Sequence, residues 1–240
     1  MILIGDVHNK VAELKRKISG LNLFDNILIQ TGDFGLGLKK YAEDLDILDD
    51  LNSFLKKRYL RLLIIRGNHD CPTYFENSEF LQLSNIKLIK DFTIESIESL
   101  DTLFIGGGIS TNRLLLKDGI DYWPTEYVHA DENKLADYDN IQLTVTHVAP
   151  SLFWPKEHTY WTTQFILKED SIGRNLAADI QEERSFMDKV LHRFNPQYWF
   201  YGHYHADRIE KVIYGDACTI AVCIGELSFF DFSTKSFLPL

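Results

Sequence analysis

The chain has 240 residues, 45% of them hydrophobic and 25% charged, which is enough to build one sizeable core. Its formal net charge of −10 argues against extended nonspecific binding to DNA or RNA, because such binding depends on basic residues that displace phosphate counterions. No stretch approaches the roughly 20 apolar residues of a membrane-spanning helix, and the opening "MILIGDVHNK" is typical of a core strand rather than a signal peptide. The three cysteines, Cys71, Cys218 and Cys223, suit a reducing compartment, so we expect a cytoplasmic protein that binds no membrane.

The N-terminal half alternates short apolar runs with amphipathic segments. We predict strands at 2–4, 26–31 and 60–65, and helices over 11–21 and 45–55, where apolar residues recur at helical spacing. This order of strand, helix and strand is that of βαβ units. It predicts an α/β fold with a largely parallel sheet.

The C-terminal half continues the pattern with less regular spacing. Further strands are expected at 103–106, 141–146 and 198–201, and a helix over 174–193 that ends before an Asn-Pro pair. The stretch 208–233 reads as consecutive antiparallel strands around a Tyr-Gly-Asp turn. Because no repeat or linker interrupts the chain, we expect a single domain over 1–240.

Polar side chains collect where the predicted strands end. They are Asp6, His8, Asp33, Asn68, His69, Asp70, His147, His203 and His205. In open α/β sheets, the side chains that perform chemistry gather at the carboxyl ends of the strands. Each short motif alone is weak evidence, but their consistent placement predicts one shared site.

Imidazole, carboxylate and amide groups together suit divalent transition metals. The candidate ligands are Asp6, His8, Asp33, Asn68, His147, His203 and His205. Seven ligands are too many for one site that must keep a position open for water. Two metals that share one carboxylate would use all seven, and such pairs clamp both oxygens of an in-line displacement.

The motifs together resemble a known signature. "GDVH" (5–8), "GD" (32–33), "GNHD" (67–70), "TH" (146–147) and "GHYH" (202–205) are similar to the motifs of the calcineurin-like metallophosphoesterases, as found in small bacterial and phage members. The resemblance implies an α/β fold: a four-layer αββα sandwich of two mixed sheets flanked by helices.

The resemblance also implies roles for individual residues. One metal would be held by Asp6, His8, Asp33 and His205, and the other by Asn68, His147, His203 and the shared Asp33. His69 would contact the substrate phosphate or protonate the leaving oxygen, which an imidazole of ordinary pKa can do near neutral pH. Asp70 would orient the ring of His69.

The implied reaction is the hydrolysis of a phosphate ester by a hydroxide that bridges the two metals. This chain has Leu36 where the family often has a second acid, and it lacks the Asp-Arg-Gly of phosphoprotein phosphatases. We therefore expect a phosphodiesterase that acts on a nucleotide or another small phosphodiester. The alternatives are a phosphomonoesterase or phosphoprotein phosphatase and, from another class, a non-catalytic scaffold. Arg66, before "GNHD", also occurs in phosphoprotein phosphatases, although a surface arginine at a strand end explains it equally well.

Two insertions rich in aromatic residues, 106–126 and 148–173, lie between the motifs. Their aromatic faces either stack a nucleobase or pin an irregular insertion to the sandwich. Candidate substrate contacts are Arg113, Trp123, Trp154 and Trp161. The remaining histidines are expected to be structural or surface residues: His129, His158 and His192.

The expected cofactors are two divalent metal ions. Manganese is the first choice, and iron, zinc, nickel, cobalt and magnesium are the alternatives, because nitrogen and oxygen ligands accept several of these ions. The expected partner is a small phosphorylated substrate, with a nucleotide as one candidate. The sequence leaves the oligomeric state open.

Overall fold

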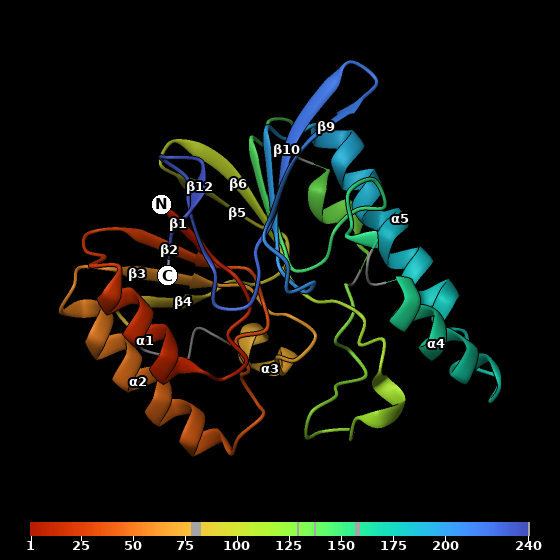
Figure 1. The fold of residues 1–240 in the computed structure, drawn as a ribbon, viewed down its shortest axis with the longest axis horizontal. Helices are drawn as coiled ribbons and strands as arrows, with labels where there is room; N and C mark the ends of the chain where they lie inside the picture. The colour runs from red at the N-terminus through yellow and green to blue at the C-terminus, as the bar shows by residue number, and fades with distance from the viewer. Residues whose placement is uncertain (78–82, 129, 137, 157–158, 240) are drawn as a thin grey trace.

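The computed structural model describes residues 1–77, 83–128, 130–136, 138–156 and 159–239, so His129 and His158 lie outside the described residues. Within this part the chain forms two six-stranded sheets that pack face to face, with helices on their outer sides (Figure 1). This is the predicted α/β fold of two mixed sheets flanked by helices.

The first sheet holds the N-terminal strands. Its order is β12 (Ser236–Phe237), β11 (Phe229–Asp231), β1 (Ile2–Ile4), β2 (Ile27–Gln30), β3 (Arg61–Ile64) and β4 (Ile86–Leu88). Strands β1 to β4 run parallel, whereas β11 pairs antiparallel with β1 and β12 with β11. The predicted N-terminal βαβ units are therefore confirmed.

The second sheet has a parallel centre with an antiparallel strand at each edge. Its order is β5 (Thr93–Ile97), β6 (Leu100–Ile105), β7 (Leu143–Thr146), β8 (Tyr198–Tyr201), β10 (Ala217–Cys223) and β9 (Arg208–Tyr214). The predicted antiparallel pair near the C-terminus is the β9–β10 hairpin, which projects beyond the rest of the sheet (Figure 1).

Helices cover both outer faces. α1 (Val11–Gly20) and α2 (Tyr41–Lys56) pack on the first sheet, and α5 (Leu176–Phe194) packs on the second, with α4 (Thr159–Asp170) beside it (Figure 1). Shorter helical segments are α3 (Pro72–Glu76), η2 (Arg113–Leu115) and η3 (Glu132–Leu135). None of the helices in the described ranges is long and apolar enough to cross a membrane.

The central strands are apolar on both faces because each face meets another layer. Leu3 packs between the two sheets, whereas Ile2 and Ile4 on either side of it pack toward α1 and α2. In β8, Phe200 likewise packs between the sheets, and its neighbour Trp199 packs toward α5. The layers therefore fix the strands firmly, and the carboxyl ends of β1, β2, β3, β7 and β8 lead into the site.

Candidate active site

The structure brings all seven predicted metal ligands together at the carboxyl ends of strands. Six of them form two groups in which one ligand atom per residue lies within 4.8 Å of the others. The first ligand group is Asp6, His8 and His205; the second is Asp33, His147 and His203. Asn68, the seventh, lies against the second group.

In the first ligand group, three atoms converge on one point. Oδ2 of Asp6 lies 3.1 Å from Nε2 of His205 and 3.7 Å from Nε2 of His8, and the two Nε2 atoms are 3.1 Å apart. This Oδ2 is buried and has no hydrogen-bond partner among the described residues, whereas Oδ1 of Asp6 accepts a bond from the His203 amide. A buried, orphaned carboxylate oxygen beside two imidazole nitrogens fits a divalent cation.

The second ligand group gains an amide oxygen. Oδ1 of Asn68 lies 3.0 Å from both Nε2 of His147 and Nδ1 of His203. Nε2 of His147 is also 3.4 Å from Oδ1 of Asp33. Two imidazole nitrogens, an amide oxygen and a carboxylate oxygen therefore face one another, which again suits a divalent transition metal.

Asp33 stands between the two groups. Its Oδ2 is 3.9 Å from Nε2 of His8, and its Oδ1 is 3.4 Å from Nε2 of His147. Each oxygen of this carboxylate thus faces a different group. Gly67 allows this arrangement, because a Cβ atom at position 67 would overlap the carboxylate. Asp33 therefore offers one oxygen to each group.

Four of the ligands have a backbone conformation that is rare outside glycine. The φ angles are 46° at His8, 56° at Asp33, 66° at His203 and 49° at His205. Left-handed backbone at such residues is unfavourable and persists where the surrounding structure enforces it, commonly at functional sites. The fold therefore accepts local strain in order to aim these side chains.

Electrostatics in the second ligand group favour a positive charge. Burial alone would lower the pKa of His147, but the neighbouring Asp33 carboxylate outweighs it and raises the pKa to about 9. Burial would likewise raise the pKa of Asp33, yet the charge of His147 holds it well below its ordinary value. For His203, burial and the charge of His147 both lower the pKa. A buried carboxylate that favours a positive charge beside it also suits a metal ion.

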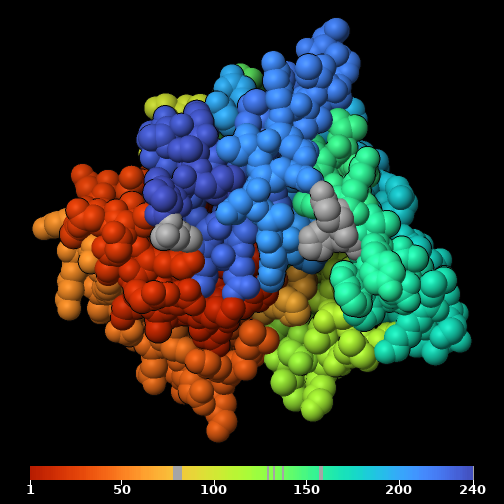
Figure 2. Space-filling view, in the orientation of Figure 1, coloured from red at the N-terminus to blue at the C-terminus, as the bar shows by residue number. Residues whose placement is uncertain are grey.

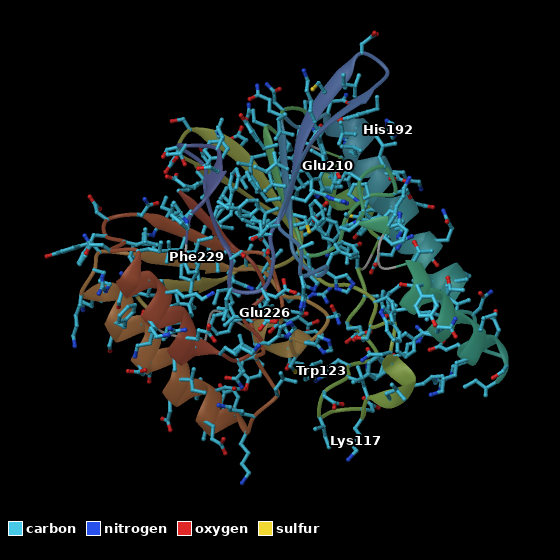
Figure 3. The ribbon with its side chains drawn as sticks, in the orientation of Figure 1. Lys117, Trp123, His192, Glu210, Glu226 and Phe229 are labelled. Carbon is cyan, nitrogen blue, oxygen red and sulfur yellow. The ribbon has the colours of Figure 1, made fainter. Side chains whose placement is uncertain are left out.

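Two ligand rings are held from behind. Nδ1 of His147 lies 2.9 Å from the carbonyl oxygen of Thr31, which directs Nε2 toward the second group. Nδ1 of His205 lies 3.6 Å from Oε2 of Glu226, and Oε1 of the same carboxylate pairs with Lys10. Glu226 lies close to where the two sheets meet (Figure 3).

Asn68 is held by a pair of residues that the sequence analysis missed. Its Nδ2 donates to Oγ of Ser110 (2.9 Å), which donates to Oε2 of Glu126 (2.8 Å). Oε1 of Glu126 accepts the Ser110 amide at 2.6 Å. Burial raises the pKa of Glu126, the bonds from Ser110 counteract part of this rise, and the resulting pKa is about 8. This chain fixes the amide so that its oxygen faces the second group. No short motif marks Ser110 or Glu126.

Arg66 supports the same segment. It is buried, with Nε and Nη2 donating to Oδ2 of Asp91 at 3.0 and 2.7 Å. Nη1 and Nη2 donate to the carbonyl oxygens of Glu126 and Tyr127. Arg66 is therefore neither a surface arginine nor a free phosphate ligand: it anchors the backbone that carries Glu126.

Asp70 binds backbone rather than the ring of His69. Its Oδ1 accepts the amides of Gly35 (2.6 Å) and Leu36 (2.9 Å), and its Oδ2 accepts those of Phe34 (3.0 Å) and Gly67 (2.8 Å). Burial and then the charge of Asp33 raise the pKa of Asp70, and these amides limit the rise. These bonds account for both oxygens, so the predicted role of orienting His69 is corrected. Asp70 instead holds the loop after β2 in place.

His69 lies beside the two ligand groups and faces the cavity. Its backbone amide donates to Oδ1 of Asp33 at 2.7 Å. Its half-buried ring stands 5.7 Å from the ring of His8 and lines the cavity above the ligands. The ring can therefore reach a group held between the ligands and the cavity.

A cavity of about 300 Å³ opens above both ligand groups. Its floor includes His8, Asp33, Asn68, His69, His203 and His205. Its walls come from the insertions and α5, among them Asn112, Trp154, Phe165, Ile180, Glu183 and Arg184. In the space-filling view the first insertion, yellow-green, borders the red and orange N-terminal half, and the second, green to teal, lies beside the first (Figure 2). Of the predicted substrate contacts, Trp154 lines this cavity.

The other predicted substrate contacts lie elsewhere. Arg113 donates to both oxygens of Glu169, at 2.7 and 2.6 Å, and to Asp179 at 2.7 Å, so it ties η2 to α4 and α5. Trp123 is buried against the loop after β2, close to α3 (Figure 3). Trp161 is 66% exposed on α4. None of these three is among the described residues that line the cavity, so the geometry corrects their predicted role.

Among solved structures, one with a TM-score of 0.58 and 14% identity matches 99% of this chain and 97% of its own, and so shares the fold. A novel archaeal phosphodiesterase matches 100% of this chain and 99% of its own, with 12% identity and a TM-score of 0.42. A cold-active protein-tyrosine phosphatase from a psychrophilic Shewanella species matches 96% of this chain and 75% of its own, with 17% identity and a TM-score of 0.32. The last two are too dissimilar in shape to carry an argument.

No curated protein matches the chain. The family model of the calcineurin-like phosphoesterases, by contrast, matches residues 1–207, a span that includes both ligand groups, Asn68 and His69. With its ligand groups at the strand ends, the chain thus belongs to the calcineurin-like phosphoesterases, a family of metal-dependent enzymes that hydrolyse phosphoric esters.

Proposed function

We propose that this enzyme binds two divalent metal ions and hydrolyses phosphodiesters, with a nucleotide or another small diester as substrate. The observation that carries the proposal is the pair of ligand groups on either side of Asp33, which offers one carboxylate oxygen to each. Asp6, His8 and His205 would hold one ion, and Asn68, His147 and His203 the other. Manganese suits this mixture of nitrogen and oxygen ligands.

The roles of the protein groups follow from their positions. When bound, two divalent cations acidify a water molecule and offset the charge of the phosphate. His69 faces the cavity from beside His8 and would donate a proton to the oxygen of the leaving group. The aromatic and aliphatic walls of the cavity would exclude bulk water and orient the ester.

Two observations favour a diester over a phosphoprotein. Leu36 occupies the place of a second acid and is buried, so no further carboxylate reaches the site from that position. Arg66, the feature that favoured a phosphoprotein phosphatase, is bound to Asp91 and two carbonyl oxygens, so it is not free to bind phosphate. A phosphomonoesterase is the alternative, and a non-catalytic scaffold would not need His69 beside an intact ligand set.

We also place the enzyme in the cytoplasm. All three cysteines are free: Cys223 is buried, Cys218 is exposed and Cys71 is intermediate. Free thiols persist in a reducing compartment.

The proposal is tested with purified protein loaded with Mn²⁺ and assayed on bis(p-nitrophenyl) phosphate, on p-nitrophenyl phosphate and on a phosphopeptide. We expect two metal ions per chain by elemental analysis and the highest kcat/KM on the diester. Two bound ions without turnover of any substrate would refute catalysis, and a preference for the phosphopeptide would favour the phosphoprotein phosphatase.

Two variants separate the proposed roles. His69→Ala should keep both metal ions and lower kcat on the diester by about 10²- to 10⁴-fold, because it removes the proton donor. Asp33→Asn should lose metal, because a neutral amide cannot bridge two cations. His192→Ala serves as the control, since this exposed ring packs on Tyr214 away from the cavity. Equal metal loss in the His69 and Asp33 variants would contradict this division.

A further inference from the structure

The wall of the cavity carries an arginine to which no motif pointed. Arg184, on α5, lines the cavity together with His69 and the metal-ligand candidates. Its guanidinium lies 3.7 Å from the centre of the Trp154 ring. This stacking uses the flat face of the guanidinium and leaves its N–H edge available for other bonds.

Two acidic groups lie near Arg184 on α5, and both interact with backbone amides. Asp188, one turn further along α5, accepts the backbone amide of Ser151 at 2.8 Å. Glu183, which also lines the cavity, interacts with the backbone amides of Val128 and Ile109 and with the charge of Arg184, and its Oε2 has no hydrogen-bond partner among the described residues. Across the described ranges, Arg184 has neither an ion pair nor a hydrogen bond, which is unusual for an arginine that is only partly exposed. The cavity therefore contains a cation whose hydrogen-bonding edge is open.

The position of Arg184 shows which part of a substrate it can reach. The Trp154 ring beneath it lies 6.4 Å from the ring of Tyr204, which lies 4.9 Å from the ring of His203. Two aromatic rings thus stand between the guanidinium and the ring of His203. A phosphate held by the ligand groups would lie on the His203 side of these rings, which places the guanidinium beside a group further along the same molecule.

We propose that Arg184, stacked on Trp154, binds a second phosphate group of the substrate, beyond the one that is hydrolysed. The planar N–H edge of an arginine matches two oxygens of a phosphate. A dinucleotide or a nucleoside bisphosphate carries such a further phosphate group. The organic part of the ester would lie along the apolar wall formed by Trp154, Phe165 and Ile180. This inference rests on the proposed function and narrows its substrate class.

The test uses two matched chromogenic diesters: the p-nitrophenyl ester of thymidine 5′-phosphate, with and without a phosphate on the 3′ oxygen. The wild-type enzyme should show the higher kcat/KM on the 3′-phosphorylated ester. Arg184→Gln should lower kcat/KM on that ester by about ten-fold or more, as expected for a lost hydrogen bond to a charged group, and leave the other ester nearly unchanged. Arg184→Lys should lose part of the preference, because it keeps the charge but not the planar edge.

Arg174→Gln is the matched control, because it removes the same charge from an exposed position outside the cavity. It should leave the preference intact. Calorimetric binding of thymidine 3′,5′-bisphosphate against thymidine 5′-phosphate gives a readout that needs no turnover. If Arg184→Gln no longer binds the bisphosphate more tightly than the monophosphate, the subsite is supported even when neither ester is hydrolysed. Absence of hydrolysis would count against the proposed function alone. Equal effects of Arg184→Gln on both esters, or no preference in the wild type, would overturn the inference.

Discussion

The amide of Asn68 must present its oxygen, and not its nitrogen, to the second ligand group. Its Nδ2 donates to Oγ of Ser110, which has to donate its own proton to Oε2 of Glu126. Because an amide nitrogen cannot ligate a cation, this chain of donors decides whether Asn68 is a ligand at all. Such outer bonds orient the ligands of a metal centre, and their loss weakens metal binding.

Ser110→Ala tests this point at the scale of one atom. The variant should bind the ion of the second ligand group about 10- to 100-fold more weakly, while the first group keeps its affinity. Stepwise Mn²⁺ titration by calorimetry measures both. Ser151→Ala is the control, because Ser151 makes its bond to Asp188 through its backbone amide. Equal weakening of both sites would show general damage instead.

At the scale of elements, the loop after β2 is tied to the turn after β3 through one carboxylate. Asp70 accepts two amides of that loop on Oδ1 and a third, together with the Gly67 amide, on Oδ2. The backbone of Asp33 belongs to this loop, so the tie also positions the shared ligand. By accepting several backbone amides, this carboxylate supplies the hydrogen bonds that a neighbouring strand would otherwise provide to them.

Asp70→Ala should therefore destabilise the fold, by about 3 kcal/mol, because several buried amides lose their acceptor at once. Urea denaturation measures this loss, and faster hydrogen exchange at Gly35 and Leu36 should locate it. Asp46→Ala, at an exposed position of α2, is the control. Unchanged stability with a shifted pH profile of kcat would instead support the predicted role of Asp70 in orienting His69.

At the scale of the whole molecule, one buried acid makes stability depend on pH. Glu183 is 8% exposed, and one of its oxygens has no hydrogen-bond partner among the described residues. Burial raises its pKa from 4.5 to about 7. The folded state thus holds a proton that the unfolded chain releases above pH 4.5. Its contribution is complete below that pH and is lost as the pH rises through 7.

Glu183→Gln should flatten this dependence. The wild type should lose more of its free energy of unfolding between about pH 5 and pH 7.5 than the variant does, because the glutamine does not ionise. Urea denaturation across this range measures the difference. Glu182→Gln, the exposed neighbour, should keep the wild-type slope. A slope identical in all three proteins would show that Glu183 ionises freely in the fold.

The sequence predicted most of the parallel strands, although not β4, and it predicted that the seven candidate ligands lie together, because both depend on local signals. An apolar run predicts a strand, and the Gly-Asp or Gly-His after it marks the strand end. The edge strand β5 and the helix α4 were missed, since "TIESI" and "TYWTTQFILKED" carry polar residues at mixed spacing. Their structure depends on packing against neighbours.

The errors at the site have a related cause. Arg113 and Trp123 were chosen because of their residue type, but ion pairs and burial in the insertions decide where such side chains lie. Arg184 was overlooked because it sits in an ordinary amphipathic helix, where an arginine is usually solvated. Its stacking on Trp154 depends on a contact 30 positions away in the chain, which no local pattern encodes.

Each ligand group draws on both sheets. The first combines Asp6 and His8 after β1 with His205 after β8, and His8 and His205 are 197 positions apart in the chain. An ion bound there would act as a non-covalent cross-link that closes a very long loop, as a disulfide does in a secreted protein. The cost of bringing the two halves together would then be met partly by the binding of the ion. Metal loading should accordingly hold the two sheets together. A fragment that carries either sheet alone would contain only part of each ligand group.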